Sequence, residues 1–151
     1  MTVDGVWWGA RAWTPAEATA ALPLVRRIAD DLVGTYGRWR KAVEAFEYAA
    51  SGTTAAAPDA EAERLMGEAQ RLAGEIDGLQ NELTTLDVRV VRLEHTLLAF
   101  RSERNGAVAP LFWAPGSMAP TYDWPDSVPA YGMSTSWPSR APIVAGNRSR
   151  A

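Results

Sequence analysis

The chain has 151 residues, which is enough for about one domain that buries roughly two thirds of its unfolded surface. Its 15 Lys and Arg side chains are outnumbered by 18 Asp and Glu side chains, so we expect no broad basic surface and no nucleic-acid partner. The absence of cysteine excludes disulfides, thiolate nucleophiles and sulfur ligands for metals. No signal-peptide pattern and no apolar run of roughly 20 residues is present, so we expect a cytoplasmic protein with no membrane partner.

The first predicted helix opens on a capping signal. Thr14 can cap the helix, Pro15 suits its first position, and Glu17 stands where a capping box needs an acid. Apolar residues then recur every three or four positions and form one stripe: Val25, Ile28, Leu32, Tyr36, Trp39, Val43 and Phe46. This pattern predicts a helix over residues 15–50.

A second helix is predicted over residues 59–84. Residues 51–58 have little to bury and end in a proline, and Asp59 can cap the helix that comes next. The apolar residues then keep a heptad spacing: Leu65, Ala69, Leu72, Ile76, Leu79, Leu83 and Leu86. The two helices predict a long antiparallel hairpin whose seams pack within one chain or between two copies, and we favour a homodimer.

After Leu86 the apolar period changes from helical to alternating, which is typical of a strand. Asn105-Gly106 is the pair best suited to a two-residue type I′ turn, and it is flanked by extended segments at 96–103 and 107–113. We therefore predict a β-hairpin that turns at Asn105-Gly106. Pro110 lacks an N–H, so it should face outward at a sheet edge or lie at a bulge.

From Ala114 onward the chain is rich in proline and aromatic residues, which predicts an irregular segment that wraps over the hairpins. Residues 145–151 have nothing to bury and should fray. The expected fold is α+β and mainly α, with a single domain over residues 1–144.

Familiar enzyme motifs are absent from the sequence, so the candidate catalytic residues are isolated ones. His95 is the only imidazole and is a candidate general base, although a lone histidine is more often structural. Arg101 can clamp a carboxylate or belong to a solvated sheet face. Asp123, beside Trp124, can act as a base or cap a turn. With no second nitrogen ligand we expect no metal site, and we expect no cofactor.

Six of the seven tryptophans lie outside the helical hairpin, where core packing seldom requires so many: Trp7, Trp8, Trp13, Trp113, Trp124 and Trp137. Aromatic residues at Phe100, Trp113, Tyr122 and Trp124 are candidates to line a pocket for an apolar small molecule. We expect a small-molecule-binding protein, in the sharpest form a cofactor-independent cyclase or isomerase for an aromatic or polyketide-like metabolite in bacterial biosynthesis. The alternative is a non-catalytic homodimeric interaction module with a Trp-rich docking surface.

Several segments together resemble a bacterial family known only as domain of unknown function 2203: Trp13-Thr14-Pro15-Ala16-Glu17-Ala18, Ala21-Leu22-Pro23-Leu24-Val25, Leu93–Phe100, Asn105-Gly106 and Leu111-Phe112-Trp113. The resemblance covers most of residues 12–143 and implies a helical hairpin, a strand, a glycine turn and a second strand. The chain departs from the family pattern where that pattern is polar. Ala99 replaces an acid, Phe112 a cysteine and Ser117 a glutamate, and the family's His near Tyr122-Asp123-Trp124 has no counterpart. The resemblance implies no activity.

Overall fold

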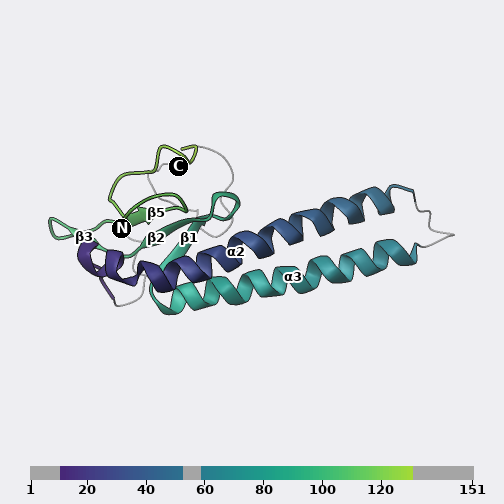
Figure 1. The fold of residues 1–151 in the computed structure, drawn as a ribbon, viewed down its shortest axis with the longest axis horizontal. Helices are drawn as coiled ribbons and strands as arrows, with labels where there is room; N and C mark the ends of the chain where they lie inside the picture. Colours follow the sequence, from purple (N-terminus) through teal and green to yellow (C-terminus); the bar gives the residue numbers. More distant parts are fainter. Residues whose placement is uncertain (1–10, 53–58, 131–151) are drawn as a thin grey trace. The chain divides into compact units, whose positions relative to one another are not determined.

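The computed structural model describes residues 11–52 and 59–130 (Figure 1). Two long helices come first, and a small antiparallel sheet comes after them, so the fold is α+β and mainly α as predicted. The elements are α2 (Pro15–Ala50), α3 (Ala60–Thr85), β1 (Val88–Arg92), the 3-10 turn η1 (Leu93–His95), β2 (Leu97–Phe100), β3 (Glu103–Arg104), β4 (Ala107–Val108) and β5 (Leu111–Trp113). The predicted fraying tail at 145–151 lies outside the described residues.

The chain forms two compact units, which we describe separately. The sheet unit comprises Met1–Ala29 and Gln80–Ala151, and the hairpin unit comprises Asp30–Leu79. Among the described residues, the sheet unit therefore contains the first turns of α2, the last turns of α3 and the strands, while the hairpin unit contains the remaining turns of both helices.

The start of α2 forms the predicted capping box in full. The Thr14 backbone N–H donates to Glu17 Oε1 at 3.0 Å, and the Glu17 backbone N–H donates to Thr14 Oγ1 at 3.1 Å. At the start of α3, Asp59 Oδ1 accepts from the Glu61 backbone N–H at 2.9 Å. These side chains satisfy backbone donors that a helix leaves unpaired in its first turn, which fixes where both helices begin.

The sheet has the order β1-β2-β5 with both pairs antiparallel. Its register aligns Val90 with Leu98 and Leu98 with Trp113, and it aligns Phe100 with Leu111. These residues share one face, on which the Trp13 ring lies edge-on to Phe100 at 5.4 Å. Arg26 of α2 lies over the Trp113 ring on the same side.

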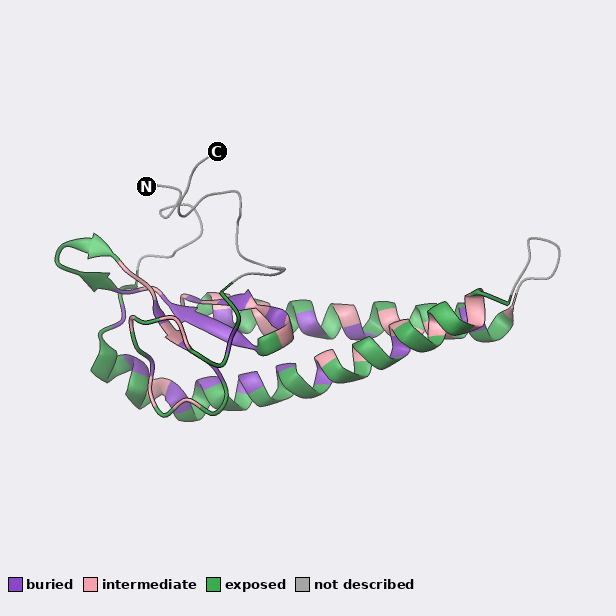
Figure 2. Cartoon of the chain, turned by 90° about the horizontal axis from the view of Figure 1, so that it is seen from above, coloured by how far each residue is buried: buried purple, intermediate pink, exposed green. Residues whose placement is uncertain are grey.

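The opposite face of the sheet is also covered. A second cluster contains Val91, Leu97, Ala99, Ala114 and Val128, with Phe112 and Trp124 packed against it. Cover on both faces explains why all four residues of β2 are buried (Figure 2). The register shifts between Val90 and Arg92, so both Val90 and Val91 are buried despite being neighbours.

The predicted turn is present at Asn105 and Gly106, whose φ angles of 55° and 82° are both positive. β3 pairs with β4 across it, and the same register continues to Phe100 opposite Leu111. In that register Pro110 lies opposite Arg101, beside the pair in which the Ala109 N–H donates to the Ser102 carbonyl at 2.9 Å. Hydrogen-bonded and non-hydrogen-bonded pairs alternate along an antiparallel ladder, so Pro110 and Arg101 form a non-hydrogen-bonded pair. The ladder therefore needs no N–H from Pro110.

The hairpin unit is less completely buried than the sheet unit. Its buried residues are Leu32, Thr35, Ala42, Ala62, Leu72 and Ile76. Tyr36, Trp39, Val43 and Phe46 of the predicted stripe are only partly buried. An ion pair of 4.0 Å joins Arg38 of α2 to Glu75 of α3, but both side chains are exposed, so it adds little stability.

Candidate functional site

The three candidate catalytic residues lie apart in the sheet unit. His95 is exposed in η1, before β2, while Arg101 directly follows the other end of that strand. The four residues of β2 lie between them and span about 13 Å, so the structure does not bring these two side chains together. Asp123 is exposed in the loop after β5, where its carbonyl accepts from Thr121 Oγ1 at 3.3 Å.

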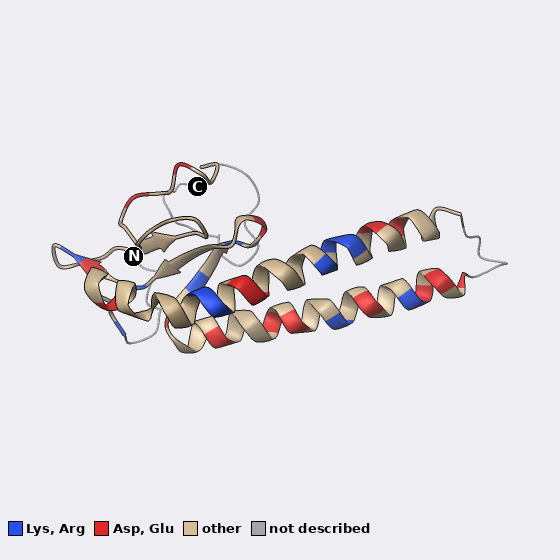
Figure 3. Ribbon diagram, viewed as in Figure 1, with Lys and Arg blue, Asp and Glu red and all other residues tan. Residues whose placement is uncertain are grey.

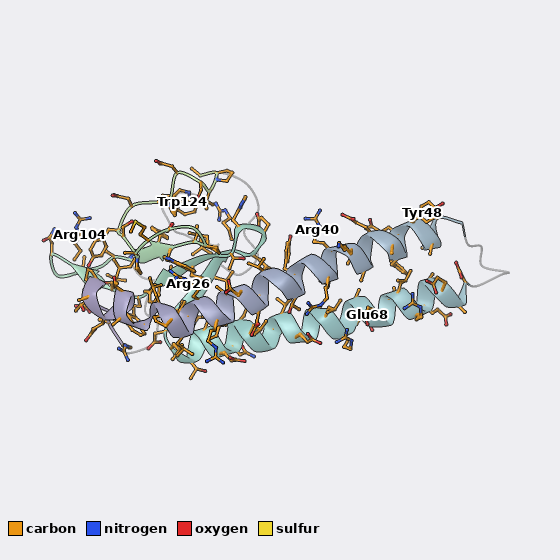
Figure 4. The ribbon with its side chains drawn as sticks, in the orientation of Figure 1. Arg26, Arg40, Tyr48, Glu68, Arg104 and Trp124 are labelled. Atoms are coloured by element: carbon orange, nitrogen blue, oxygen red, sulfur yellow. The ribbon has the colours of Figure 1, made fainter. Side chains whose placement is uncertain are left out.

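The four candidate ligand-binding aromatics do not share one surface. Phe100 and Trp113 are 0% and 1% exposed on the sheet face that Trp13 covers. Trp124 is partly buried against the other face, where its ring lies edge-on to Phe112 at 5.3 Å. Tyr122 is also partly buried, and its ring lies 4.8 Å from the Arg104 guanidinium (Figure 4). The sheet itself therefore separates Phe100 and Trp113 from Trp124.

Core packing accounts for two of the tryptophans that lie outside the helical hairpin. The Trp13 Nε1–H donates to the Leu86 carbonyl at 2.9 Å, and the Trp113 Nε1–H donates to the Ser117 carbonyl at 3.0 Å. Both rings are nearly inaccessible, and both indole N–H groups are satisfied by backbone. Trp7, Trp8 and Trp137 lie outside the described residues.

Arg101 is held inside the sheet unit by its own neighbours. Its side chain is 16% exposed and lies 3.6 Å from Glu103 Oε2, and its Nη1 donates to the Arg11 carbonyl at 3.3 Å. Its backbone carbonyl accepts from the Trp13 N–H at 2.7 Å. The Arg101 Nε is buried without a hydrogen-bond partner among the described residues. These contacts fasten the segment before α2 to the sheet.

Ser102 is a buried polar residue that sequence reasoning missed. It is 1% exposed, its hydroxyl donates to the Trp13 carbonyl at 2.5 Å, and the Tyr122 hydroxyl lies 3.1 Å from it. The Tyr122 hydroxyl also reaches the Glu103 carbonyl at 3.2 Å. These contacts link three segments that are far apart in sequence. No sequence signal marks Ser102, because its partners are backbone and a distant tyrosine.

A second arrangement lies where η1 meets the C-terminal loop. The Arg92 guanidinium lies over the Trp124 ring at 5.1 Å, and the Trp124 Nε1–H donates to the Val128 carbonyl at 2.8 Å. Arg92 Nε and Glu94 Oε1 are buried without a hydrogen-bond partner among the described residues. This arrangement combines a cation over a partly buried ring with unpaired polar atoms nearby in sequence. Such groups can bind an aromatic ligand that carries one polar group.

An open hollow lies in the hairpin unit, at the end of α2 and the start of α3. It is lined by Ala45, Tyr48, Ala49, Ser51, Gly52, Asp59, Glu61 and Leu65. None of the predicted site residues lies there.

Two other features are absent from the described ranges. Within residues 11–52 and 59–130, no three acidic or histidine side chains gather as a metal site would need. In the same ranges, neither helix combines the length and the apolar character that crossing a bilayer requires.

Comparison with known protein families shows that residues 11–122 match the model of the family DUF2203, which is described as an uncharacterized conserved protein. The chain belongs to this family. No curated protein and no solved structure matches it. Membership confirms the resemblance seen in the sequence, and because DUF2203 is uncharacterised it brings no activity.

Two of the positions at which the sequence was expected to depart from the family pattern meet in the structure. Ala99 of β2 and Phe112 of β5 are cross-strand partners, and Phe112 packs edge-on against Trp124. Position 117 instead lies in the turn after β5, where the Ser117 N–H donates to the Ala114 carbonyl at 2.9 Å. At positions 99 and 112 the sheet face beneath Trp124 is therefore apolar in this member of the DUF2203 family, while Arg89, the other cross-strand partner of Ala99, lies on the same face.

Proposed function

We propose that this protein is a non-catalytic interaction module that assembles with a second copy of itself through the helical hairpin. The observation that carries the proposal is the exposure of large apolar side chains in the hairpin unit. Val33, Tyr48 and Met66 are 48%, 85% and 43% exposed. Apolar surface of this kind on a pair of helices is typical of an interface, since a second copy can cover it with helices of its own.

The arrangement of the sheet unit supports the same proposal. Two of its candidate catalytic residues, the general-base candidate His95 and the carboxylate-clamp candidate Arg101, lie at opposite ends of β2, and two of its four candidate ligand aromatics are core residues. General acid–base catalysis requires groups within hydrogen-bond reach of one substrate. The geometry therefore favours assembly over catalysis.

Light scattering coupled to size-exclusion chromatography tests the proposal over a dilution series of the full chain. We expect a mass twice the chain mass of 16.4 kDa at high concentration and dissociation on dilution. Hydrogen exchange at concentrations above and below the dissociation constant should then differ within residues 30–79. A mass of one chain at every concentration would overturn the proposal.

A second candidate function is the binding of an aromatic small molecule beside Trp124, which the unpaired Arg92 Nε and Glu94 Oε1 favour. A flat aromatic carboxylate would stack on Trp124 and pair with Arg92. Ligand-observed NMR with 1-naphthoate tests this function. We expect saturable binding that Trp124→Leu abolishes and Trp39→Leu, on the hairpin, leaves intact. Equal binding by both variants, or none by the wild type, contradicts it.

A further inference from the structure

Helix α2 carries a charge pattern along its length that is complementary to itself. Asp30 and Asp31 form an acidic pair, and Arg38, Arg40 and Lys41 form a basic cluster. The six residues between them, 32–37, are uncharged. In Figure 3 this uncharged stretch separates a red band from a blue band of α2, with a further blue band before the red one and a further red band after the blue one.

One exposed stripe of α2 is available to a partner. Asp30, Val33, Gly37, Arg40 and Glu44 follow one another at spacings of three and four residues, so they lie on one side of the helix. All five are exposed, and Figure 4 shows Arg40 on the side of α2 away from α3. Arg40 pairs with Glu44 at 3.4 Å, whereas Asp30 forms no ion pair within the described ranges.

From this pattern, and resting on the proposed function above, we infer that the second copy docks antiparallel on this α2 stripe, with the two-fold axis near residue 35. Antiparallel pairing about that point places Asp30 opposite Arg40 of the second copy, and Arg40 opposite its Asp30. Val33 then lies opposite Gly37. A two-fold interface repeats every contact, so two Asp–Arg pairs flank two Val–Gly contacts.

Gly37 allows the α2 helices of the two copies to approach each other closely. A Cβ at Gly37 would meet no atom within 4 Å in the single chain, so nothing inside the hairpin unit requires glycine there. Glycine in a helix interior is also unfavourable compared with most other residues. In the antiparallel pair the missing side chain leaves room for Val33 of the second copy. A parallel pair would instead place Asp30 beside Asp30 and Arg40 beside Arg40, which charge repulsion disfavours.

Charge exchange between two variants tests the inference directly. In Asp30→Arg homodimers two arginine pairs face each other, and in Arg40→Asp homodimers two aspartate pairs do. We expect each variant alone to weaken self-association by at least about tenfold, measured by sedimentation equilibrium in 0.1 M salt. An equimolar mixture forms heterodimers in which both pairs have opposite signs again, so association should return to near the wild-type value. Asp31→Arg, one residue off the stripe, is the matched control and should retain association.

Gly37→Gln provides a second test that does not depend on charge. It should raise the thermal midpoint of the single chain, since it adds a better helix former in open space, yet lose self-association. Gly74→Gln on α3, where a Cβ also meets nothing within 4 Å, is the control and should keep it. If the wild type is a monomer, the proposed function itself fails. If the wild type is a dimer, but the mixture is no tighter than the single variants or Gly37→Gln still dimerises, this inference alone is overturned.

Discussion

Phe100 of the sheet unit and Phe46 of the hairpin unit are the same type of side chain, but they differ in burial, and this difference reflects how the two units are built. Phe100 is fully buried in β2, because the sheet is covered on both faces. Phe46 follows the apolar stripe of α2 but is only partly buried, because two helices cover each other along one side. Burial thus depends on the number of layers around a residue more than on its hydrophobicity.

The largest expected effect comes from removing each ring in turn. Phe100→Ala should lower the free energy of unfolding by about 3–5 kcal/mol, as in other fully buried sites. Phe46→Ala should cost about 1–2 kcal/mol, since less apolar area leaves water. Urea unfolding of both variants under conditions where the chain is monomeric gives the comparison, with the slope checked for equality. Equal losses would mean that the hairpin unit is packed as fully as the sheet unit.

A smaller effect is expected from the buried hydroxyl that joins segments of the sheet unit. Ser102→Ala removes the donor to the Trp13 carbonyl and a partner of the Tyr122 hydroxyl, so it should cost about 1–3 kcal/mol of unfolding free energy. Ser117→Ala is the matched control, because this partly buried residue makes its bonds through backbone, and it should change stability by less than about 0.5 kcal/mol. If Ser102→Ala lowers the free energy of unfolding no more than Ser117→Ala does, the hydrogen bonds of the Ser102 hydroxyl add no stability.

The smallest effect concerns the exposed ion pairs of α3 in the hairpin unit. Arg71 donates to both carboxylate oxygens of Glu68 at 3.2 and 2.8 Å, and this hydrogen bonding lowers the pKa of Glu68 below its ordinary 4.5 (Figure 4). The folded state therefore holds this proton less tightly than the unfolded state. The resulting stabilisation is present above pH 4.5 and is lost as the pH falls through the lowered pKa.

NMR titration of the Glu68 carboxyl carbon in the wild type and in Arg71→Gln measures this shift. The variant should return the pKa of Glu68 toward 4.5 with little change in thermal midpoint, since exposed pairs contribute little. Arg64→Gln is the control. Arg64 donates hydrogen bonds to Glu61 and lowers its pKa, so this variant should mainly raise the pKa of Glu61. An unchanged Glu68 pKa in Arg71→Gln would contradict the assignment.

Local chemistry made much of the fold predictable. Thr14 and Glu17 mark the start of α2 because their side chains satisfy the donors of that very turn, and Asn105-Gly106 marks the β-turn because few other pairs tolerate positive φ twice. The heptad and stripe spacings set the bounds of the helices to within about a residue. Such signals are carried by residues adjacent in sequence.

The candidate site was less predictable, for a reason visible in three residues. Trp113 and Trp124 both look like pocket aromatics in sequence, but strand register and the return of the C-terminal loop put them on opposite faces of the sheet. Ser102 looks like an ordinary surface residue, yet partners 89 and 20 positions away bury it. Contacts at such separations leave no local pattern.

The sequence by itself determined the helices, the turn and the self-complementary charges of α2, because each depends on spacing along one element. Only the tertiary structure decided which aromatics are core, which polar groups are enclosed, and that the hairpin unit keeps apolar side chains in solvent. Those outcomes depend on how many layers cover each face, and layers are built from segments that meet only once the chain has folded.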